Sequence, residues 1–274
     1  MTAPRFIAGA TARRATAILS TPLTLTLIDI SPMTAFFALI PAAGVGTRMA
    51  AGEPKQYLQV AGKAVLRHVL DTFAACAAIT HTYVVVADDD TAIDALIRQA
   101  PHLETRVTIL RDGGATRAQT VHNALQALRA VCRDADWLLV HDAARPGLTT
   151  MLIDSLIATL RGDAVGGLLA LPLVDTIKRA DGNARSSGTV PRDGLWAAQT
   201  PQMFRYRLLC DATAQPGAFT DEASAVEALG LQPKLVRGSA RNFKLTAPED
   251  LALAALYLSH PVSLSVLSGE PKHE

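Results

Sequence analysis

The chain has 274 residues, of which 49% are hydrophobic and 19% are charged, and its 26 basic and 25 acidic residues leave a net charge of +1. This composition is that of an ordinary globular protein and excludes disordered, collagen-like and coiled-coil chains. The charge balance provides no basic field of the kind that nonspecific nucleic-acid binding requires, so we expect a small-molecule substrate and no nucleic-acid partner. The cysteines Cys76, Cys132 and Cys210 lie far apart, which argues against a disulfide framework or a structural zinc site and is typical of a cytoplasmic protein.

The two ends of the chain differ in character from its middle. Residues 1–28 contain arginines and threonines but no acidic residue, which is compatible with a targeting segment or with translation that begins at Met33. We expect 1–32 to be a poorly ordered extension. The uncharged run 251–269 contains a proline and several serines. It therefore predicts the end of a helix and a flexible tail over 260–274 rather than a membrane span.

From residue 36 onward, short apolar runs alternate with amphipathic segments. The apolar runs predict strands over 36–41, 83–87, 106–110, 137–140, 164–171 and around 235–236. Helical spacing of apolar residues predicts helices around 65–73, 93–97, 121–128, 152–157, 206–212 and 221–229, with a last helix from 248 and Thr149 as a cap. Such alternation indicates an α/β sandwich whose mostly parallel sheet is covered on both faces.

The alternation is interrupted over 172–196. This stretch contains Asp-Gly turn dipeptides at 181–182 and 193–194, with short β-prone pieces beside them. An isolated hairpin is marginally stable in water unless something covers it. We therefore expect a protruding β-arm that packs on a second subunit, within a single domain that spans 33–259.

The end of the first expected strand carries the most informative motif. Residues 41–49 read Pro-Ala-Ala-Gly-Val-Gly-Thr-Arg-Met, and 54–57 read Pro-Lys-Gln-Tyr. Small residues at the carboxyl edge of a parallel sheet let backbone N–H groups approach an anionic ligand, and Arg48 and Lys55 add two cations. The spacing fits neither a dinucleotide fingerprint nor a P-loop. A plain glycine turn with solvated charges is the alternative.

Together with several blocks further along, this loop resembles the 2-C-methyl-D-erythritol 4-phosphate cytidylyltransferases of the nucleotidyltransferase superfamily. The loop alone is shared across the superfamily. Narrower support comes from blocks in the family's order at 113–117, 140–146, 175–179, 194–196, 199–204, 220–224 and 242–246. The resemblance implies a three-layer, Rossmann-like fold of the nucleotide-diphospho-sugar transferase type.

The resemblance also implies a reaction. CTP and 2-C-methyl-D-erythritol 4-phosphate would give 4-diphosphocytidyl-2-C-methyl-D-erythritol and pyrophosphate, in the non-mevalonate route to isoprenoid precursors, with Mg²⁺ required. The acceptor phosphate is already ionised and needs no strong general base. The protein therefore contributes positioning and electrostatic stabilisation, as is typical of phosphoryl-group transfer. A cytoplasmic homodimer joined through the β-arm, with no membrane partner, is expected.

Residue roles follow from the same resemblance. The catalytic cations would be Arg48 and Lys55, which act on the transition state and the leaving group, and Arg192 and Lys244, which hold the methylerythritol phosphate. The substrate-binding residues would be Ala42, Ala43, Gly44, Gly46, Gly114, Thr120, Asp142, Ala143, Arg145 and Thr176, with Asp142 also the Mg²⁺ ligand. Because Thr176 and Arg192 fall on the expected arm, the acceptor site would be completed across a dimer interface. Some family members carry an acidic residue where Ala115 stands, so the contacts to the base near this position are expected to differ from theirs.

The residues by themselves also allow plainer interpretations. Asp142 could be a structural carboxylate or a helix cap, and Arg145 a structural ion pair. Arg192 could be a solvated turn residue, and Lys244 could extend its stem along a strand toward water. His141 is assigned no role.

Two other functions compete with the expected one. A cytidylyltransferase for another polyol phosphate, such as ribitol 5-phosphate, would share the nucleotide half of the site. A nucleotide-binding regulatory module that has lost catalysis would have little need for cations that act on the leaving group.

Overall fold

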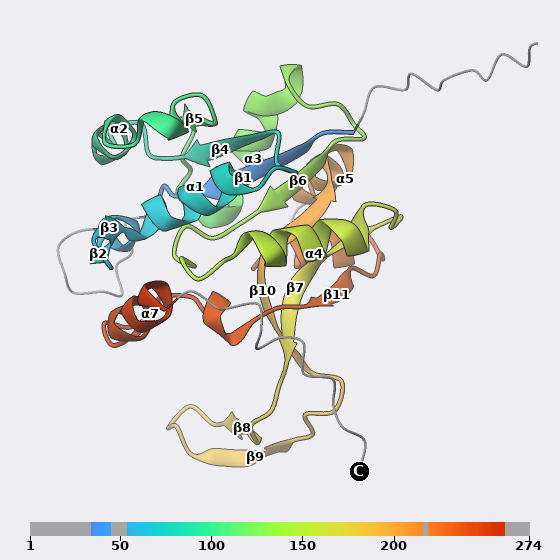
Figure 1. The fold of residues 1–274 in the computed structure, drawn as a ribbon. Helices are drawn as coiled ribbons and strands as arrows, with labels where there is room; N and C mark the ends of the chain where they lie inside the picture. Colours follow the sequence, from blue (N-terminus) through green and yellow to red (C-terminus); the bar gives the residue numbers. More distant parts are fainter. Residues whose placement is uncertain (1–33, 45–53, 216–218, 261–274) are drawn as a thin grey trace, which may run out of the picture. The chain divides into compact units, whose positions relative to one another are not determined.

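A seven-stranded sheet lies at the centre of the computed structural model, which describes residues 34–44, 54–215 and 219–260 (Figure 1). Its strands are β1 (Phe36–Pro41), β4 (His81–Val85), β5 (Val107–Leu110), β6 (Trp137–Val140), β7 (Gly166–Pro172), β10 (Trp196–Arg205) and β11 (Lys234–Arg237). They are ordered β11-β7-β10-β6-β1-β4-β5. Only β10 runs antiparallel to its neighbours in this sheet, so the expected mostly parallel sheet is confirmed.

The six predicted strands match observed strands of this sheet, with one informative shift, whereas the seventh strand, β10, was not predicted. The strand expected over 83–87 begins two residues earlier, at His81. His81 and Thr82 are polar, so the apolar pattern hid them. They nevertheless pair with Phe37 and Ala38 of β1, and the Thr82 N–H donates to the Arg106 carbonyl at 3.0 Å.

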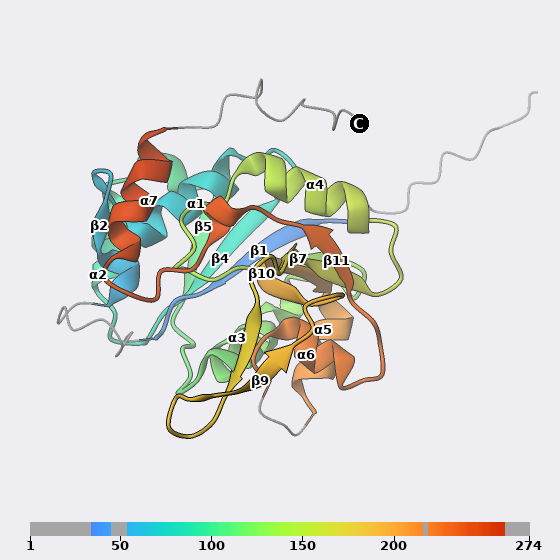
Figure 2. The same ribbon diagram turned by 90° about the horizontal axis from the view of Figure 1, so that it is seen from below.

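Helices cover both faces of the sheet (Figure 2). Helices α1 (Val65–Ala75), α2 (Ala92–Arg98) and α4 (Thr150–Leu160) contribute to one apolar core with the sheet. Helices α3 (Arg117–Ala127), α5 (Tyr206–Thr213) and α6 (Glu222–Glu227) pack in a second core on the opposite face. This arrangement confirms the expected three-layer α/β sandwich.

Short elements complete the described structure. A small sheet of β2 (Gln59–Val60) and β3 (Lys63–Ala64) contacts the last helix, α7 (Asp250–Ser259), through a third apolar cluster. Single 3-10 turns occupy η1 (Lys55–Tyr57), η2 (Pro101–Leu103), η3 (Leu128–Ala130) and η4 (Ala240–Asn242). No helix in the described ranges has the length and apolar character needed to cross a bilayer.

Side-chain caps fix the start of three helices. Thr149 caps α4 as expected, since its hydroxyl accepts from the Leu152 N–H at 3.3 Å. Thr116 caps α3, and Asp221 forms a capping box with Ser224 at the start of α6. These caps satisfy N–H groups that the helix itself leaves unpaired. Two of them begin the helices that later supply side chains to the site.

The stretch 172–196 contains the expected hairpin. Strands β8 (Ile177–Ala180) and β9 (Ser186–Val190) pair antiparallel as a separate sheet, beyond the ends of β7 and β10 (Figure 1). Apolar side chains at its base are exposed, Val174 by 73% and Trp196 by 38%. The packing of this hairpin on a second subunit stays a prediction.

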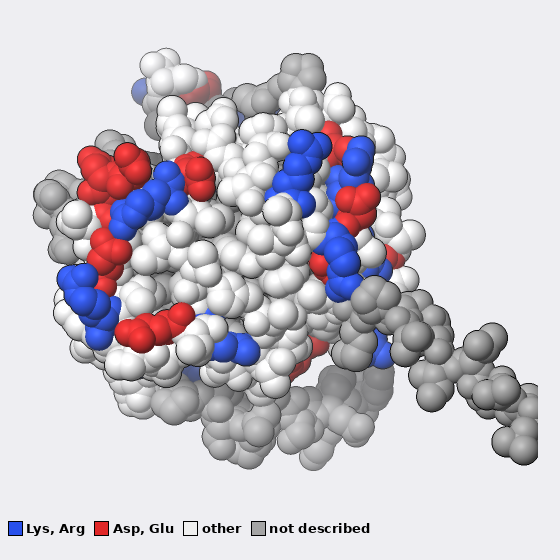
Figure 3. All heavy atoms as spheres, turned by 90° about the horizontal axis from the view of Figure 1, so that it is seen from above, with Lys and Arg blue, Asp and Glu red and all other residues white. Residues whose placement is uncertain are grey.

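On the face shown in Figure 3, lysines and arginines lie close to aspartates and glutamates in small mixed groups. Mixed signs at short range limit the field that this face projects into solvent. The expected N-terminal extension, 1–32, and the expected tail beyond residue 260 lie outside the described residues.

Candidate active site

The site is built where the parallel strands of the sheet end. Strand β1 leads into residues 42–44 and β6 into Asp142. These exits are tied together by backbone hydrogen bonds, since the Ala42 N–H donates to the Val85 carbonyl at 2.7 Å and the His141 N–H donates to the Leu39 carbonyl at 2.9 Å. The carboxyl edge of such a sheet is where α/β proteins bind ligands.

Gly113 brings the exit of β5 against the exit of β1. A Cβ at this position would lie 2.6 Å from the Ala43 Cβ and 2.7 Å from the Val86 carbonyl oxygen. Both separations are shorter than atoms tolerate, so only glycine allows this close approach. The next residue, Gly114, donates its N–H to the Thr120 hydroxyl at 3.0 Å. Gly113 and Gly114 therefore shape one wall of the site. A pair of glycines considered alone would predict only a turn.

A cavity of about 380 Å³ opens at this edge of the sheet. The residues that follow β1 contribute small side chains to its lining, and charged side chains come from other elements. It is lined by Pro41, Ala42, Ala43, Gly44, Lys55, Gln56, Gly114, Ala115, Thr116, Arg117, Thr120, Asp142, Ala143, Ala144 and Lys244. Its size is within the range of small-ligand sites.

Asp142 is the electrostatic centre of this cavity. Its carboxylate is 9% exposed and accepts hydrogen bonds from Arg117 Nε at 2.9 Å, Lys244 Nζ at 3.0 Å and Arg145 Nε at 3.4 Å. Burial alone would raise the pKa of Asp142, but the three cations, with Arg117 foremost, lower it far below its usual range. The carboxylate is therefore ionised at neutral pH. No helix begins at Asp142, so the helix-cap interpretation is wrong.

The backbone around Asp142 is held by a buried chain of hydrogen bonds. The Asp142 N–H donates to the Thr200 hydroxyl at 3.0 Å, Thr200 Oγ1 lies 2.9 Å from His141 Nδ1, and His141 Nε2 lies 3.2 Å from the Arg145 carbonyl oxygen. This pattern assigns the proton to Nε2, with Nδ1 accepting from Thr200. Burial lowers the pKa of His141 to about 4. His141 is thus a neutral structural residue beside the site.

Two lysines converge on the cavity from distant parts of the chain. Lys55, in η1, donates through Nζ to the Leu245 carbonyl at 3.3 Å, next to Lys244. Its neighbour Gln56 donates through Nε2 to the carbonyls of Ala42 at 2.8 Å and Gly44 at 3.2 Å. Gln56 thereby ties η1 to the exit of β1. Because the Lys244 ammonium contacts Asp142, the interpretation of Lys244 as a stem that merely extends to water is wrong.

A second hollow of about 170 Å³ adjoins the first. The two share Arg117, Asp142 and Lys244, and the smaller one adds Arg145 with polar groups from β10 and the start of α6. It is lined by Arg117, Asp142, Arg145, Ala198, Gln199, Thr200, Gln202, Thr220, Asp221 and Lys244. The two hollows therefore share one charged centre.

Comparison with known proteins identifies the family. A sequence profile described as 2-C-methyl-D-erythritol 4-phosphate cytidylyltransferase matches residues 36–260. The chain belongs to this family. A cytidylyltransferase of that name from Dechloromonas aromatica (strain RCB) is 50% identical over 222 residues, covering 81% of this chain and 96% of the relative. One from Nitrosomonas eutropha is 52% identical over 229 residues, covering 82% and 97%.

Solved structures of the family share the fold of this cytidylyltransferase. A crystal structure of 4-diphosphocytidyl-2C-methyl-D-erythritol synthase is 42% identical with a TM-score of 0.74, over 82% of this chain and 99% of that one. The 2-C-methyl-D-erythritol 4-phosphate cytidylyltransferase from Thermus thermophilus is 30% identical with a TM-score of 0.64, over 81% and 98%. The expected Rossmann-like nucleotidyltransferase fold is therefore confirmed.

The structure brings together most of the residues predicted for the site of this cytidylyltransferase. The larger cavity is lined by the predicted residues Ala42, Ala43, Gly44, Lys55, Gly114, Thr120, Asp142, Ala143 and Lys244. Arg145 lines the smaller hollow, where it also donates to the Asn242 carbonyl at 2.9 Å. The bond to the Asn242 carbonyl supports the interpretation of Arg145 as a structural residue, in addition to its expected role in binding substrate.

Of the four other predicted residues, two lie elsewhere in the described structure and two fall outside it. Thr176 and Arg192 are on the β8–β9 arm and, within the described chain, line neither hollow. The Arg192 guanidinium donates to the Val174 carbonyl, which orders the base of the arm. Gly46 and Arg48 fall in 45–53, outside the described residues, so their roles stay predictions.

The sequence interpretation missed Arg117 and Glu222. Arg117 follows the cap of α3 and contacts Asp142, while Glu222 accepts from both terminal nitrogens of Arg117. A cation in the first turn of a helix opposes the helix dipole, and this was a signal that Arg117 has another partner. Glu222 gave no such signal, because an acid in a first turn is usually explained by the dipole. Burial alone would lower the pKa of Arg117, but both acids raise it and keep it charged.

Proposed function

We propose that CTP binds in the larger cavity while this chain transfers CMP from CTP to 2-C-methyl-D-erythritol 4-phosphate. The products are 4-diphosphocytidyl-2-C-methyl-D-erythritol and pyrophosphate. The observation that carries this proposal is the convergence of Lys55, Lys244 and Arg117 on one cavity at the exit of β1, in a chain of this family. Three cations around one hollow suit a triphosphate.

The proposed chemistry needs little from the protein beyond charge and position. An oxygen of the acceptor phosphate attacks the α-phosphorus of CTP in line, the bond to the bridging oxygen breaks, and pyrophosphate leaves with the electron pair. Negative charge grows on the leaving group and on the equatorial oxygens, where Lys55 and Lys244 offset it. By the family resemblance, Gly46 and Arg48 would also contact the triphosphate. The neutral His141 takes no proton in this scheme.

We propose Mg²⁺ as the cofactor, with Asp142 as its protein ligand. Mg²⁺ commonly uses one or two carboxylates and takes its other ligands from waters and substrate phosphates. Asp142 fits this donor set, because its Oδ1 accepts one hydrogen bond, from Arg117 Nε, and an ionised carboxylate oxygen can accept more than one. When bound, Mg²⁺ would neutralise part of the triphosphate charge.

We also propose a cytoplasmic homodimer in which the arm completes the acceptor site. Support comes from exposed apolar side chains at the base of the arm, Val174, Leu195 and Trp196, and from the unpaired cysteines of the described chain, which suit a reducing compartment. Activity should follow the dimer fraction on dilution, as measured by light scattering beside turnover. A verified monomer that turns over at the normal rate would contradict this part of the proposal.

The reaction is tested by offering purified protein CTP and Mg²⁺ with each of two acceptors and measuring pyrophosphate release. We expect kcat/KM with methylerythritol phosphate to exceed that with ribitol 5-phosphate by at least about 10²-fold, because a site built to hold one set of hydroxyls leaves polar groups unpaired with another. A preference for ribitol 5-phosphate would overturn the acceptor assignment. Tight CTP binding without product from either acceptor would instead indicate a regulatory module.

A further inference from the structure

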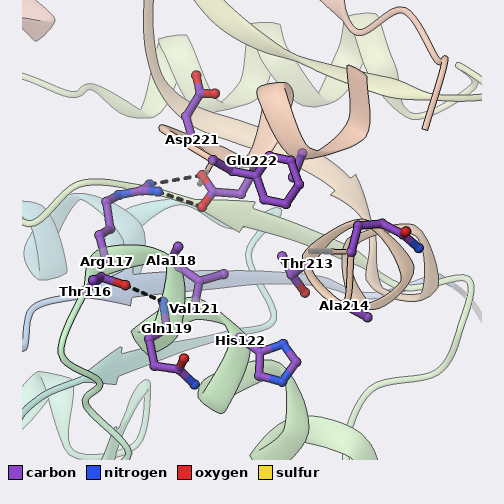
Figure 4. Close-up of a pocket in the computed structure, with 13 residues that line it drawn as sticks. Thr116, Arg117, Ala118, Gln119, Val121, His122, Thr213, Ala214, Asp221 and Glu222 are labelled. Atoms are coloured by element: carbon purple, nitrogen blue, oxygen red, sulfur yellow. Dashed lines mark hydrogen bonds and ion pairs between the residues drawn. The ribbon is translucent and has the colours of Figure 1, made fainter. Parts of the chain in front are cut away.

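Arg117 joins two parts of the molecule that are far apart in sequence. Its Nη1 and Nη2 donate to Glu222 Oε1 at 2.7 Å and Oε2 at 3.0 Å, and its Nε donates to Asp142 Oδ1 at 2.9 Å. Figure 4 shows the bidentate contact of Arg117 with Glu222, beside a third hollow that both residues line. Every nitrogen of the guanidinium is therefore committed to an acid.

We infer that Glu222 is a positioning residue for cytidylyl transfer, acting on Asp142 through Arg117. A bidentate contact between arginine and a carboxylate fixes the plane of the guanidinium. With that plane fixed, the Nε–H points at one oxygen of Asp142 and sets the orientation of the carboxylate. The inference rests on the proposed role of Asp142 in the nucleotide site.

The start of α6 is anchored in a way that suits this role. Gln202 of β10 is buried, and its side chain donates to Asp221 Oδ2 at 2.8 Å and accepts from the Ala223 N–H at 2.7 Å. The residues on both sides of Glu222 are thus held by one side chain of the central sheet. Glu222 itself is only 3% exposed. A buried carboxylate held this firmly can transmit position.

Charge gives a second reason. Asp142 and Glu222 face Arg117, Arg145 and Lys244, which leaves this cluster with one excess positive charge. Glu222→Gln keeps the shape of the side chain but raises the excess to two and turns amide protons toward Arg117. The arginine would then be drawn toward Asp142 or toward the triphosphate. Either movement displaces the carboxylate from its working position.

The test compares Glu222→Gln and Glu222→Asp with the unaltered enzyme, using pyrophosphate release from CTP and methylerythritol phosphate. We expect Glu222→Gln to lower kcat by about 10- to 100-fold, as misplacement by an ångström can. The KM for methylerythritol phosphate should stay within about threefold. Glu222→Asp should recover part of the lost kcat, because it restores the charge. Asp94→Asn is the matched control, since Asp94 also accepts from an arginine, Arg111, with both oxygens, at the surface.

A double-mutant cycle separates positioning from simple loss of stability. If Glu222 acts through Arg117, adding Glu222→Gln to Arg117→Gln should lower kcat no further, and the two changes should be strongly non-additive. Multiplicative effects would overturn the inference, as would a folded Glu222→Gln enzyme with unchanged kcat. If Glu222→Gln does not fold, a Glu222→Asp enzyme that shows the kcat loss at unchanged KM supports the inference, and one with unchanged kcat overturns it. Failure of the unaltered enzyme to release pyrophosphate would instead contradict the proposed function.

Discussion

Lys55→Ala should lower kcat/KM for CTP by at least about 10²-fold, the effect seen when one group that stabilises transition-state charge is removed. The ammonium lines the cavity at the exit of β1, and its hydrogen bond to the Leu245 carbonyl places it beside Lys244. Removing it leaves the departing pyrophosphate short of one cation. Steady-state pyrophosphate release at varied CTP measures the loss.

The fold should hardly respond to this substitution. Each hydrogen bond lost costs about 1 kcal/mol, so the thermal midpoint should move by only a few degrees for each one. Lys63→Ala is the matched control, because Lys63 lies near Lys55 in the chain and pairs with Asp71 at 2.8 Å with 49% of its side chain exposed. We expect its activity within about threefold of the unaltered enzyme. Equal losses in both variants would show that Lys55 has no special place in the reaction.

Local patterns predicted most elements of the fold because local physics determines them. They missed β10, whose apolar pattern is interrupted by Gln199, Pro201 and Gln202. The apolar run of β6 and the hydroxyl before α4 each act within a few residues, and both were found where the sequence placed them. The start of β4 was missed because a central strand can begin with polar residues when its neighbours supply the backbone partners. Pairing of that kind is a property of the sheet rather than of the segment.

The site divides in the same way. The glycine loop and the Asp142 block could be recognised, since each carries its chemistry in a short stretch. The contacts among Glu222, Arg117 and Asp142 span 105 and 25 residues of sequence. They exist only because α6, α3 and β6 meet at one edge of the sheet, and no spacing in a single segment encodes that meeting. For the same reason, sequence alone could not show that Asp142 is shared by two hollows.

Asp142→Asn should impair both activity and stability, since it removes a buried carboxylate that faces three cations. At pH 7 the free energy of unfolding should fall by about 3 kcal/mol, the lower end of the range for breaking a buried ion pair. The lower end of this range applies because the side chains of the partners are partly exposed to solvent, 37% for Lys244 and 27% for Arg117. The value of kcat should fall by at least about 10²-fold. Urea unfolding and pyrophosphate release measure the two effects.

The stability loss should depend on pH with a defined sign. The pKa of Asp142 is lowered on folding, so its ionised form stabilises the native state above the unfolded pKa of about 4, and this contribution is lost as pH falls. Below about pH 4 the contribution of Asp142 to the free energy of unfolding should decline by up to about 1.4 kcal/mol for each pH unit. The asparagine variant has no such group, so the difference between the two proteins should be constant from about pH 7 to 5 and should narrow at about pH 3.5. A difference that does not narrow there would mean that the three cations do not hold this carboxylate in its ionised form.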